Sequence, residues 1–327
     1  MNELICPNCQ SLNRVGAIYC AICGRSLENA ATVAMDDAPT APRVYAGQEA
    51  GPIEEAQTVQ MRRNLGLRVG HRTDVGRSRA SNEDSLLALE FTLSNKSVDE
   101  PAGLFVVADG MGGHEGGEIA SGMLVRAMAR QAAAEWLPRL AAEDEEPLDG
   151  GQWVVGAIQA GNREIFDWAR DTGLAMGTTV VAALLMGQQA AVAHVGDSRA
   201  YRLTPAFIER LTVDHSLVES LVVANQISRE EARDHPQSNV IYRTIGDRRE
   251  VAADLRELTL TAGESLLLCS DGLSGMLTDE IIHQTVIATA TPQAACDALI
   301  DAANRAGGED NITVILITAA PSGRVVG

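Results

Sequence analysis

The sequence has few aromatic residues and no long apolar run. Phe, Trp and Tyr make up 3% of its 327 residues, so a core must be built from Ala, Val, Leu and Ile. No apolar stretch approaches the ~20 residues that a transmembrane helix needs. The first residues, 1–6, lack the charged-then-apolar pattern of a signal peptide. We therefore expect a cytoplasmic protein without a membrane partner.

Basic residues are also scarce. The chain has 26 Lys and Arg against 44 Asp and Glu, which gives a formal net charge of −18 at pH 7. General nucleic-acid binding depends on neutralising phosphates with Lys and Arg, so we do not expect nucleic acid as a partner. Most of the acidity is explained by solubility, and part of it would be offset if some carboxylates held cations.

Cysteine is limited to six residues, and four of them form a pattern. Two Cys-x-x-Cys motifs, ten residues apart, are formed by Cys6, Cys9, Cys20 and Cys23. This spacing allows four thiolates to close a tetrahedral structural Zn²⁺ site, as in a zinc ribbon. The alternative, redox dithiols or disulfides, is disfavoured in a reducing compartment. Cys269 lies in an apolar run and Cys296 in an expected helix, so we expect both to be buried packing residues.

The composition divides the chain into three parts. Residues 1–27 form the zinc ribbon, residues 28–64 a flexible linker rich in Ala, Thr, Pro and acids, and residues 65–320 the main domain. A ribbon of this size cannot hold a core without its metal.

The main domain alternates strand-like and helix-like segments, which favours an α+β fold. Residues 118–136 predict a helix that stops before Pro138, and residues 154–170 a second helix. The buried side of the second helix is expected to carry Val155, Ile158, Ile165 and Trp168.

The later segments follow the same alternation. Residues 178–185 and 190–195 predict two strands joined by a turn, and Tyr201–Leu203 continues the meander. Residues 216–244 are expected to be a mostly helical, polar flap near the site, and residues 292–305 a late helix.

Seven acidic residues lie in short turns that carry Gly, Ser or Asn: Glu83, Asp84, Asp109, Asp197, Asp214, Asp271 and Asp310. Three of these turns adjoin apolar, strand-like runs. Carboxylates at the ends of buried strands can meet at one edge of a sheet, and hard oxygen ligands suit Mg²⁺ or Mn²⁺. Any one of these motifs could be an ordinary turn, because Asp and Gly favour turns for backbone reasons.

The order of the motifs is more specific than any one of them. Six motifs follow one another between Arg79 and Thr313: Arg79-Ala-Ser-Asn-Glu-Asp84, Ala108-Asp-Gly-Met-Gly-Gly-His114, Met176-Gly-Thr-Thr179, Val195-Gly-Asp-Ser-Arg-Ala-Tyr201, Ser270-Asp-Gly-Leu273 and Glu309-Asp-Asn-Ile-Thr313. This series resembles the bacterial metal-dependent serine/threonine protein phosphatases of the type-2C family, and the resemblance runs from about Gly70 to Ile317. The resemblance implies two stacked antiparallel β-sheets flanked by helices, with the metal site at one end between the sheets.

The resemblance also implies a set of ligands. Asp109 would bridge two Mn²⁺ or Mg²⁺ ions, the carbonyl of Gly110 would bind one ion, and Asp271 with Asp310 would hold the other. A water activated by the two ions would attack the phosphate, so no side-chain nucleophile is required.

Three further positions are implied in the same way. Glu83 would act mainly through coordinated water, and Asp84 would orient that shell. Asp197, together with Asp271, would hold a third, weaker ion, although a turn cap is the alternative for Asp197.

Arg79 is expected to bind the substrate phosphate, because a guanidinium can grip two phosphate oxygens at once. The general acid stays open: animal members of the family have a histidine directly after the Asp-Gly pair, where this chain has Met111. His114, or a water, could protonate the leaving group instead. We expect His194 and His215 to be structural.

The resemblance implies an enzyme that hydrolyses phosphoserine and phosphothreonine in proteins and so opposes bacterial Ser/Thr kinases. The alternatives are a non-catalytic scaffold and a regulator-type phosphatase acting on anti-sigma antagonists. Retention of the acids with Arg79 favours the kinase-opposing enzyme. Three linker threonines, Thr32, Thr40 and Thr58, could be phosphorylated and then bound by a phosphothreonine-binding domain.

Overall fold

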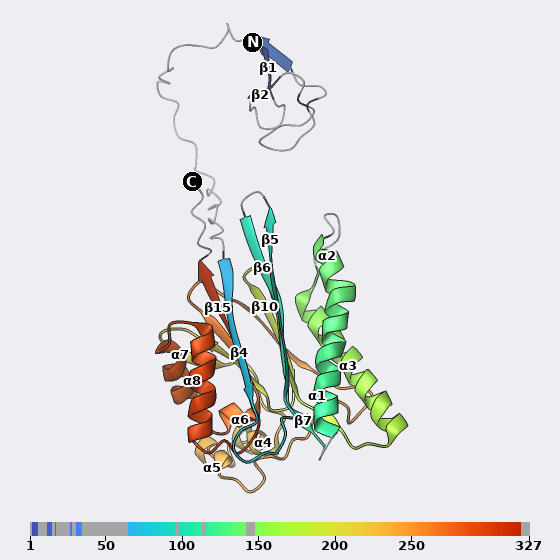
Figure 1. The fold of residues 1–327 in the computed structure, drawn as a ribbon, viewed down its shortest axis with the longest axis vertical. Helices are drawn as coiled ribbons and strands as arrows, with labels where there is room; N and C mark the ends of the chain where they lie inside the picture. Colours follow the sequence, from blue (N-terminus) through green and yellow to red (C-terminus); the bar gives the residue numbers. More distant parts are fainter. Residues whose placement is uncertain are drawn as a thin grey trace. The chain divides into compact units, whose positions relative to one another are not determined.

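The computed structural model describes residues 2–5, 12–14, 17, 27, 31–34, 65–95, 98–112, 116–141 and 148–321 (Figure 1). The chain divides into two units, Met1–Gln60 and Met61–Gly327. No helix in the described part of the chain is both long and apolar enough to cross a membrane.

The N-terminal unit contains a three-stranded antiparallel sheet in the order β2-β1-β3. Its strands are β1 (Asn2–Ile5), β2 (Leu12–Arg14) and β3 (Ala31–Ala34). Strand β3 lies within the stretch that we expected to be linker, so this part of residues 28–64 is paired with β1. The four cysteines of the expected zinc site lie outside the described residues.

The larger unit is built on two five-stranded antiparallel sheets. The first has the order β13-β10-β9-β6-β5, with strands β5 (Ser85–Asn95), β6 (Val98–Ala108), β9 (Val180–Met186), β10 (Gln189–Val195) and β13 (Asp254–Thr259). The second has the order β12-β11-β14-β15-β4, with strands β4 (Leu65–Asp74), β11 (Arg199–Leu203), β12 (Ile208–Arg210), β14 (Ser265–Cys269) and β15 (Ile312–Pro321). A short third sheet pairs β7 (Gly110–Met111) with β8 (Gly177–Thr178).

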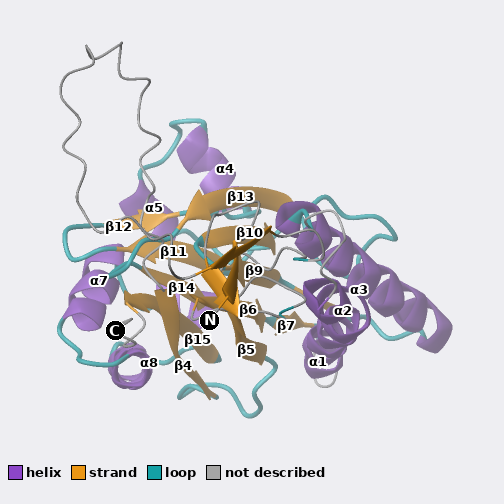
Figure 2. Ribbon diagram, turned by 90° about the horizontal axis from the view of Figure 1, so that it is seen from above, coloured by secondary structure: helices purple, strands orange, loops and turns teal. Residues whose placement is uncertain are grey.

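Helices cover the outer face of each sheet, as Figures 1 and 2 show. The first sheet is covered by α1 (Gly116–Gln131), the π-helical segment η2 (Ala132–Trp136), α2 (Leu137–Ala141) and α3 (Gly150–Thr172). The second is covered by α6 (Asp271–Ser274), α7 (Asp279–Ile287) and α8 (Pro292–Arg305). Two short helices, α4 (Leu217–Val223) and α5 (Arg229–Arg233), lie between β12 and β13 in the chain. The expected architecture of two antiparallel sheets flanked by helices is confirmed.

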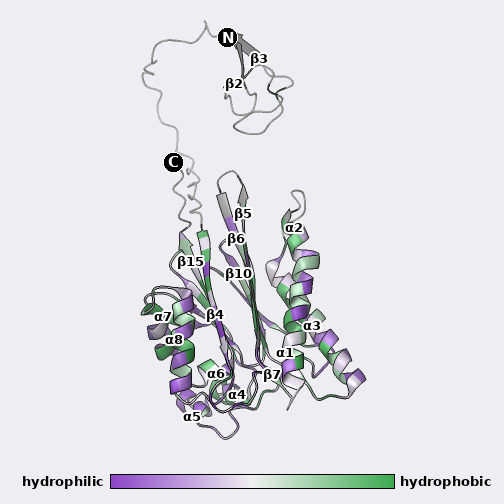
Figure 3. Cartoon of the chain, in the orientation of Figure 1, coloured by the Kyte–Doolittle hydropathy of each residue, from purple (hydrophilic) through white to green (hydrophobic). Residues whose placement is uncertain are grey.

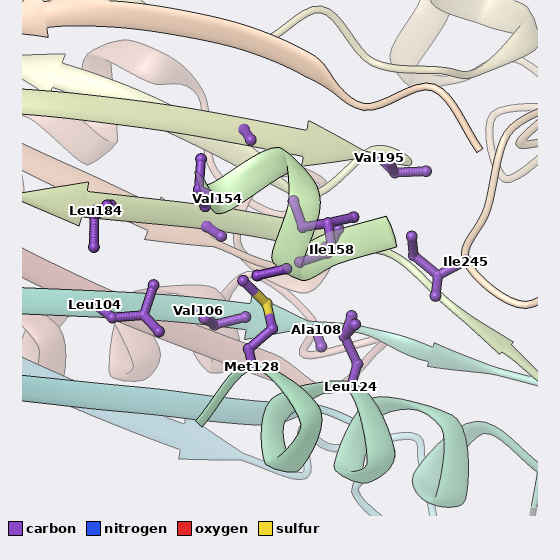
Figure 4. Close-up of a cluster of buried hydrophobic side chains, with 14 of the residues drawn as sticks. Leu104, Val106, Ala108, Leu124, Met128, Val154, Ile158, Leu184, Val195 and Ile245 are labelled. Atoms are coloured by element: carbon purple, nitrogen blue, oxygen red, sulfur yellow. The ribbon is translucent and has the colours of Figure 1, made fainter. Parts of the chain in front are cut away.

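Alternation along the central strands explains this layering, because successive side chains of a strand point to opposite faces. Leu104 and Val106 of β6 join the cluster under α1 and α3 (Figure 4), while Phe105 and Val107 join the cluster between the two sheets. Strands buried on both faces therefore appear as unbroken apolar runs. Each helix instead carries both hydrophobic and hydrophilic residues (Figure 3), as expected for a helix that packs one face against a sheet and exposes the other.

Most expected elements of the larger unit are confirmed, with three corrections. The first helix continues past Pro138, because η2 and α2 follow α1 without a break. The Leu137 N–H bonds to Ala132 O, five residues back. The wider π-type turn just before Pro138 allows the helical chain to continue through this residue, which has no N–H to donate.

The other two corrections concern α3 and the flap. Ile158 and Ile165 are buried as expected, but Val155 and Trp168 are only partly buried, and Trp153 and Val154 take the inner positions. The segment 216–244 is not mostly helical: α4 and α5 are short, and turns connect them. Cys269 and Cys296 are both buried, as expected.

Candidate metal and phosphate site

The acidic turns meet at one end of the two sheets. Asp109 directly follows β6, and Ser85, the first residue of β5, pairs with Ala108, so Asp84 lies beside Asp109. On the second sheet, Asp271 follows β14 and Asp310 precedes β15, at the end where Cys269 pairs with Val314. Antiparallel pairing thus brings the start of one strand next to the end of its neighbour, and gathers residues that lie far apart in the sequence.

A cavity of about 670 Å³ opens at this end. Six of the expected site residues line it: Arg79, Glu83, Asp109, Gly110, Asp271 and Asp310. Asp84 and Asp197 do not line it; both are buried and interact electrostatically with Asp109 and Asp271. The site residues that the structure describes are therefore brought together.

Four buried carboxyl groups have raised pKa values: those of Asp84, Asp109, Asp197 and Asp271. Burial is the main cause for all four, and it raises the pKa of Asp84 to about 7. The pKa of Asp109 lies well above its usual range because burial is followed by repulsion from Asp84, Asp271 and Asp197. The pKa of Asp197 and that of Asp271 are raised by burial and then by neighbouring carboxylates. Such groups resist ionisation unless positive charge is supplied.

Unsatisfied oxygen atoms support the same conclusion. The Oδ1 atoms of Asp84, Asp197 and Asp271 are buried without a hydrogen-bond partner among the described residues. Buried polar atoms are nearly always satisfied in folded proteins, so unpaired ones require an explanation. Buried, mutually repelling carboxylates with free oxygens are the donor set that a hard divalent cation would satisfy. The residues present thus fit Mg²⁺ or Mn²⁺.

Two side chains fasten the first sheet to the second at this end. Ser270 Oγ donates a 2.8 Å hydrogen bond to Asp84 Oδ2 across 186 positions of sequence, and the Thr313 N–H donates to Ser270 Oγ. The Glu83 N–H donates to Asn311 Oδ1 at 2.8 Å, and Asn311 Nδ2 donates to the carbonyl of Ser81. Asp84 and Glu83 are therefore held in place by the turns that carry Asp271 and Asp310.

The Met-Gly-Thr-Thr motif holds the backbone of Asp109. The Thr179 N–H and Thr178 Oγ1 both donate to Asp109 O at 2.8 Å, and the Asp109 N–H donates to Thr179 Oγ1 at 3.1 Å. Thr179 Oγ1 also lies 2.7 Å from the hydroxyl of Ser198, next to Asp197. The sequence showed this motif but gave no role for its hydroxyl groups.

Two glycines permit the close approach of backbone that the site needs. A Cβ on Gly117, at the start of α1, would lie 2.7 Å from the backbone carbon C of Gly110, next to Asp109, and one on Gly272 would lie 2.0 Å from Asn311 O. Any side chain at either position would push an acidic turn away from the cavity.

Arg79 reaches the cavity from the loop between β4 and β5. Its Nη2 atom lies 2.5 Å from Asp310 Oδ2, and its side chain is 53% exposed. The guanidinium is thus at the cavity mouth, where an incoming anion can meet it.

Two cavity residues were not identified from the sequence. Asn239 and Ile241 line the cavity from the segment expected to form a flap. The proximity of this segment to the site was expected, but neither residue lies in a motif that marks it.

Asp214, the remaining acid of the seven, does not line the cavity. It is buried and paired with Arg199, with Nη2 2.6 Å from Oδ2, and Arg210 Nη1 lies 3.8 Å from the same oxygen. Met111, which has no proton to give, lines the cavity. His114 lies outside the described residues.

Comparisons with known proteins identify the family of this chain. Residues 77–301 match the family model described as protein phosphatase 2C. The chain is 40% identical over 248 residues to the serine/threonine phosphatase stp of Listeria monocytogenes, covering 75% of this chain and 93% of that protein. It is 34% identical to the protein phosphatase PhpP of Streptococcus pneumoniae, covering 75% of this chain and 95% of that one.

Solved structures are similar as well. The serine/threonine phosphatase Stp1 from Staphylococcus aureus matches with a TM-score of 0.65 and 33% identity, over 77% of this chain and 95% of that one. The catalytic domain of the serine threonine protein phosphatase PstP, in complex with two manganese ions, also matches with a TM-score of 0.65 and 33% identity, over 78% of this chain and 99% of that one. The chain belongs to the protein phosphatase 2C family of metal-dependent serine/threonine protein phosphatases.

Proposed function

We propose that the cavity at the end of the two sheets is the active site of this phosphatase, and that it holds two divalent cations. The observation that carries the proposal is the group of buried, mutually repelling carboxyl groups in and directly around the cavity lining, in which one oxygen each of Asp84, Asp197 and Asp271 has no partner among the described residues. Asp109, Asp271 and Asp310 line the cavity, and Asp84 and Asp197 interact electrostatically with Asp109 and Asp271. Five clustered carboxylates carry more negative charge than one divalent cation can neutralise.

The ligands follow from the residues that line the cavity. We propose that Asp109 bridges the two ions, that the carbonyl of Gly110 contacts one of them, and that Asp271 and Asp310 hold the other. The ions, when bound, would activate a water and neutralise charge on the phosphoryl oxygens. Either Mn²⁺ or Mg²⁺ fits this donor set.

The outer residues of the site have supporting roles. Glu83 lines the cavity and would act mainly through coordinated water. Asp84 is buried behind it and would orient that shell, because Ser270 fixes one of its oxygens and leaves the other free. Asp197, which interacts electrostatically with Asp271, would share a third and weaker ion with it.

Arg79 would bind the phosphate of the substrate. Its guanidinium can donate two parallel hydrogen bonds to two phosphate oxygens, and its place at the cavity mouth brings the phosphate to the acids. The proton of the leaving alkoxide would come from His114 or from a water, because Met111 has no proton to give.

The substrates would be phosphoserine and phosphothreonine side chains of proteins that a bacterial Ser/Thr kinase modifies. The exposed mouth of the cavity supports this, since a phosphorylated side chain of a protein must reach the acids from outside. A phosphothreonine-binding domain would be a further partner if Thr32, Thr40 or Thr58 is phosphorylated. An unchanged intact mass of the protein after incubation with candidate kinases would refute phosphorylation of these threonines.

The first 64 residues would form a separate module. We propose that Cys6, Cys9, Cys20 and Cys23 bind one structural Zn²⁺, which requires reduced thiols and so fits the cytoplasm. Metal analysis should find one zinc per chain that survives dialysis and is lost in Cys6→Ser with Cys9→Ser. Zinc content unaffected by this double substitution would contradict the assignment.

Hydrolysis of p-nitrophenyl phosphate and of a phosphothreonine peptide, with Mn²⁺ and then with excess chelator, tests the function. We expect both substrates to be hydrolysed with Mn²⁺ and neither with chelator. Activity that chelator leaves unchanged would refute a metal-dependent site, and activity toward the small ester alone would refute the protein substrate.

A further inference from the structure

A second cluster of metal-type side chains lies outside the cavity. Among the described residues, one set of three brings possible ligand atoms within 4.8 Å of one another: His194, His215 and Asp254. The two imidazole rings are buried and stacked, with centroids 4.8 Å apart and planes 7° from parallel. A metal site is the first hypothesis for such a cluster, but the hydrogen bonds of His215 indicate another role.

The His215 ring is not arranged as a metal ligand. The Gly196 N–H donates to His215 Nδ1 at 3.0 Å. A backbone N–H can only donate, so Nδ1 carries the lone pair and the proton of the neutral ring is on Nε2. Burial lowers the pKa of His215 to about 4, so the ring is neutral near pH 7. Nε2, 3.5 Å from Asp254 Oδ2, therefore has no free lone pair to offer a cation.

His215 instead holds Gly196 at two points. Its ring accepts from the Gly196 N–H, and its own backbone N–H donates to Gly196 O at 2.9 Å. Gly196 has a φ of +106°, and a Cβ there would lie 2.6 Å from Thr179 Cγ2. The turn is thus fixed by His215 on one side and closed by Thr179 on the other.

The residue that follows this turn is Asp197. Its carboxyl group is buried, and its Oδ1 atom has no hydrogen-bond partner among the described residues. The Ser198 hydroxyl bonds to Thr179, which also holds Asp109. The position of the Asp197 carboxylate therefore depends on the backbone turn that carries it.

We propose that His215 is a positioning residue for the metal site: by clamping Gly196, it sets the place of the Asp197 carboxylate and so the affinity for the ion that Asp197 binds. The inference rests on the proposed role of Asp197 as a ligand. The His215 ring would act on the metal site only through the backbone of Gly196, and it would contact neither an ion nor the substrate.

Two substitutions at position 215 separate the clamp from simple packing. In His215→Asn the side-chain oxygen lies near the place of Nδ1 and can still accept from the Gly196 N–H. In His215→Gln the amide reaches toward the place of Nε2 and leaves that N–H without its acceptor. His194→Gln is the matched control, because His194 is the stacked partner ring and its Nε2 lies near Val213 O, away from Gly196.

The experiment measures Mn²⁺ binding to the full chain by calorimetry, with thermal unfolding to show that each variant is folded. Asp197→Asn identifies the binding step that Asp197 supports. We expect His215→Gln to weaken that step roughly five- to tenfold, the contribution of about one buried hydrogen bond. In His215→Asn and His194→Gln, the Mn²⁺ affinity of that step should stay within about twofold of the wild type. The tighter Mn²⁺ binding steps should not change in any variant at position 215 or 194.

The outcomes distinguish the two levels of the proposal. If Asp197→Asn removes a binding step and His215→Gln leaves that step unchanged, the clamp is wrong and the Asp197 assignment stands. Equal weakening by His215→Gln, His215→Asn and His194→Gln would also overturn the clamp, since packing alone would explain it. If Asp197→Asn removes no binding step, the proposed role of Asp197 fails first.

Discussion

Arg79 Nη2 lies 2.5 Å from Asp310 Oδ2, across 231 positions of the sequence. The pair joins the proposed phosphate-binding residue to a proposed metal ligand. Because the Arg79 side chain is 53% exposed, the ion pair contributes little to stability, and its partner can change when a cation or a phosphate enters. Arg79 can therefore leave its ion pair with Asp310 and pair with the phosphate of the substrate instead.

Replacing Arg79 by lysine should lower kcat/KM for p-nitrophenyl phosphate by roughly ten- to a hundredfold. Lysine keeps the charge but cannot donate two parallel hydrogen bonds, and one charged hydrogen bond contributes about 1.5–3 kcal/mol. Mn²⁺ affinity should not fall, since Arg79 is not a ligand. Arg77→Lys, on the same loop but away from the cavity lining, is the control; equal losses in both variants would contradict the assignment.

Removing one charge from the cavity should nearly abolish activity. Asp109→Asn or Asp271→Asn should each lower kcat by about 10² or more, because preorganised charge at a reacting phosphate contributes several kcal/mol. Steady-state kinetics at saturating Mn²⁺ measure the loss. Asp171→Asn, on the exposed end of α3, should retain wild-type activity. Full activity in either cavity variant would refute the proposed site.

In the metal-free protein, Asp84 should contribute a loss of stability as the pH rises from about 4 to about 7. Burial, the largest cause, raises the pKa of Asp84 from 3.8 to about 7. In this window the folded state therefore keeps a proton that the unfolded state releases, and the free energy of unfolding falls with pH. Thermal unfolding in chelator measures it.

The matched variant for this prediction is Asp84→Asn, which has no proton to lose at that position. Its thermal stability in chelator should fall less steeply across the window, and saturating Mn²⁺ should stabilise the wild type most at the upper end, where the acids would otherwise repel one another. Identical slopes for wild type and variant would show that Asp84 does not titrate in this way.

Deleting residues 1–64 should leave the hydrolysis of p-nitrophenyl phosphate within about twofold of the full chain. Strand β4 begins at Leu65, and every residue lining the cavity lies after it. Loss of activity in a truncated chain that still shows a cooperative thermal transition would contradict the proposed division into modules.

The sequence predicted that the acids meet at one end of the sheets better than it predicted the boundaries of the elements. Asp109 and Asp271 follow apolar runs and Asp310 precedes one, so strand periodicity placed them at sheet ends, and the motif order placed those ends together. Helix α8 was expected over its observed length. The hydrogen bonds that hold the acids were not predictable, because the partnership of Ser270 with Asp84 depends on how two sheets stack.

The misses have local physical reasons. Pro138 is a common end signal for a helix, but here a π-type turn precedes it and the chain continues as α2. Strand β3 lies in a stretch whose composition is that of a linker, and its pairing with β1 is a contact distant in sequence. Asn239 and Ile241 enter the cavity from a turn-rich segment without periodicity, so no pattern identified them.

A crystal structure of the Mn²⁺-loaded chain, with anomalous diffraction at the manganese edge, tests the central claim most directly. We predict two strong anomalous peaks inside the cavity, both beside Asp109, one of them also beside the Gly110 carbonyl and the other beside Asp271 and Asp310. A cavity without anomalous signal under conditions that support hydrolysis, or manganese bound instead at His194 and His215, would contradict the account.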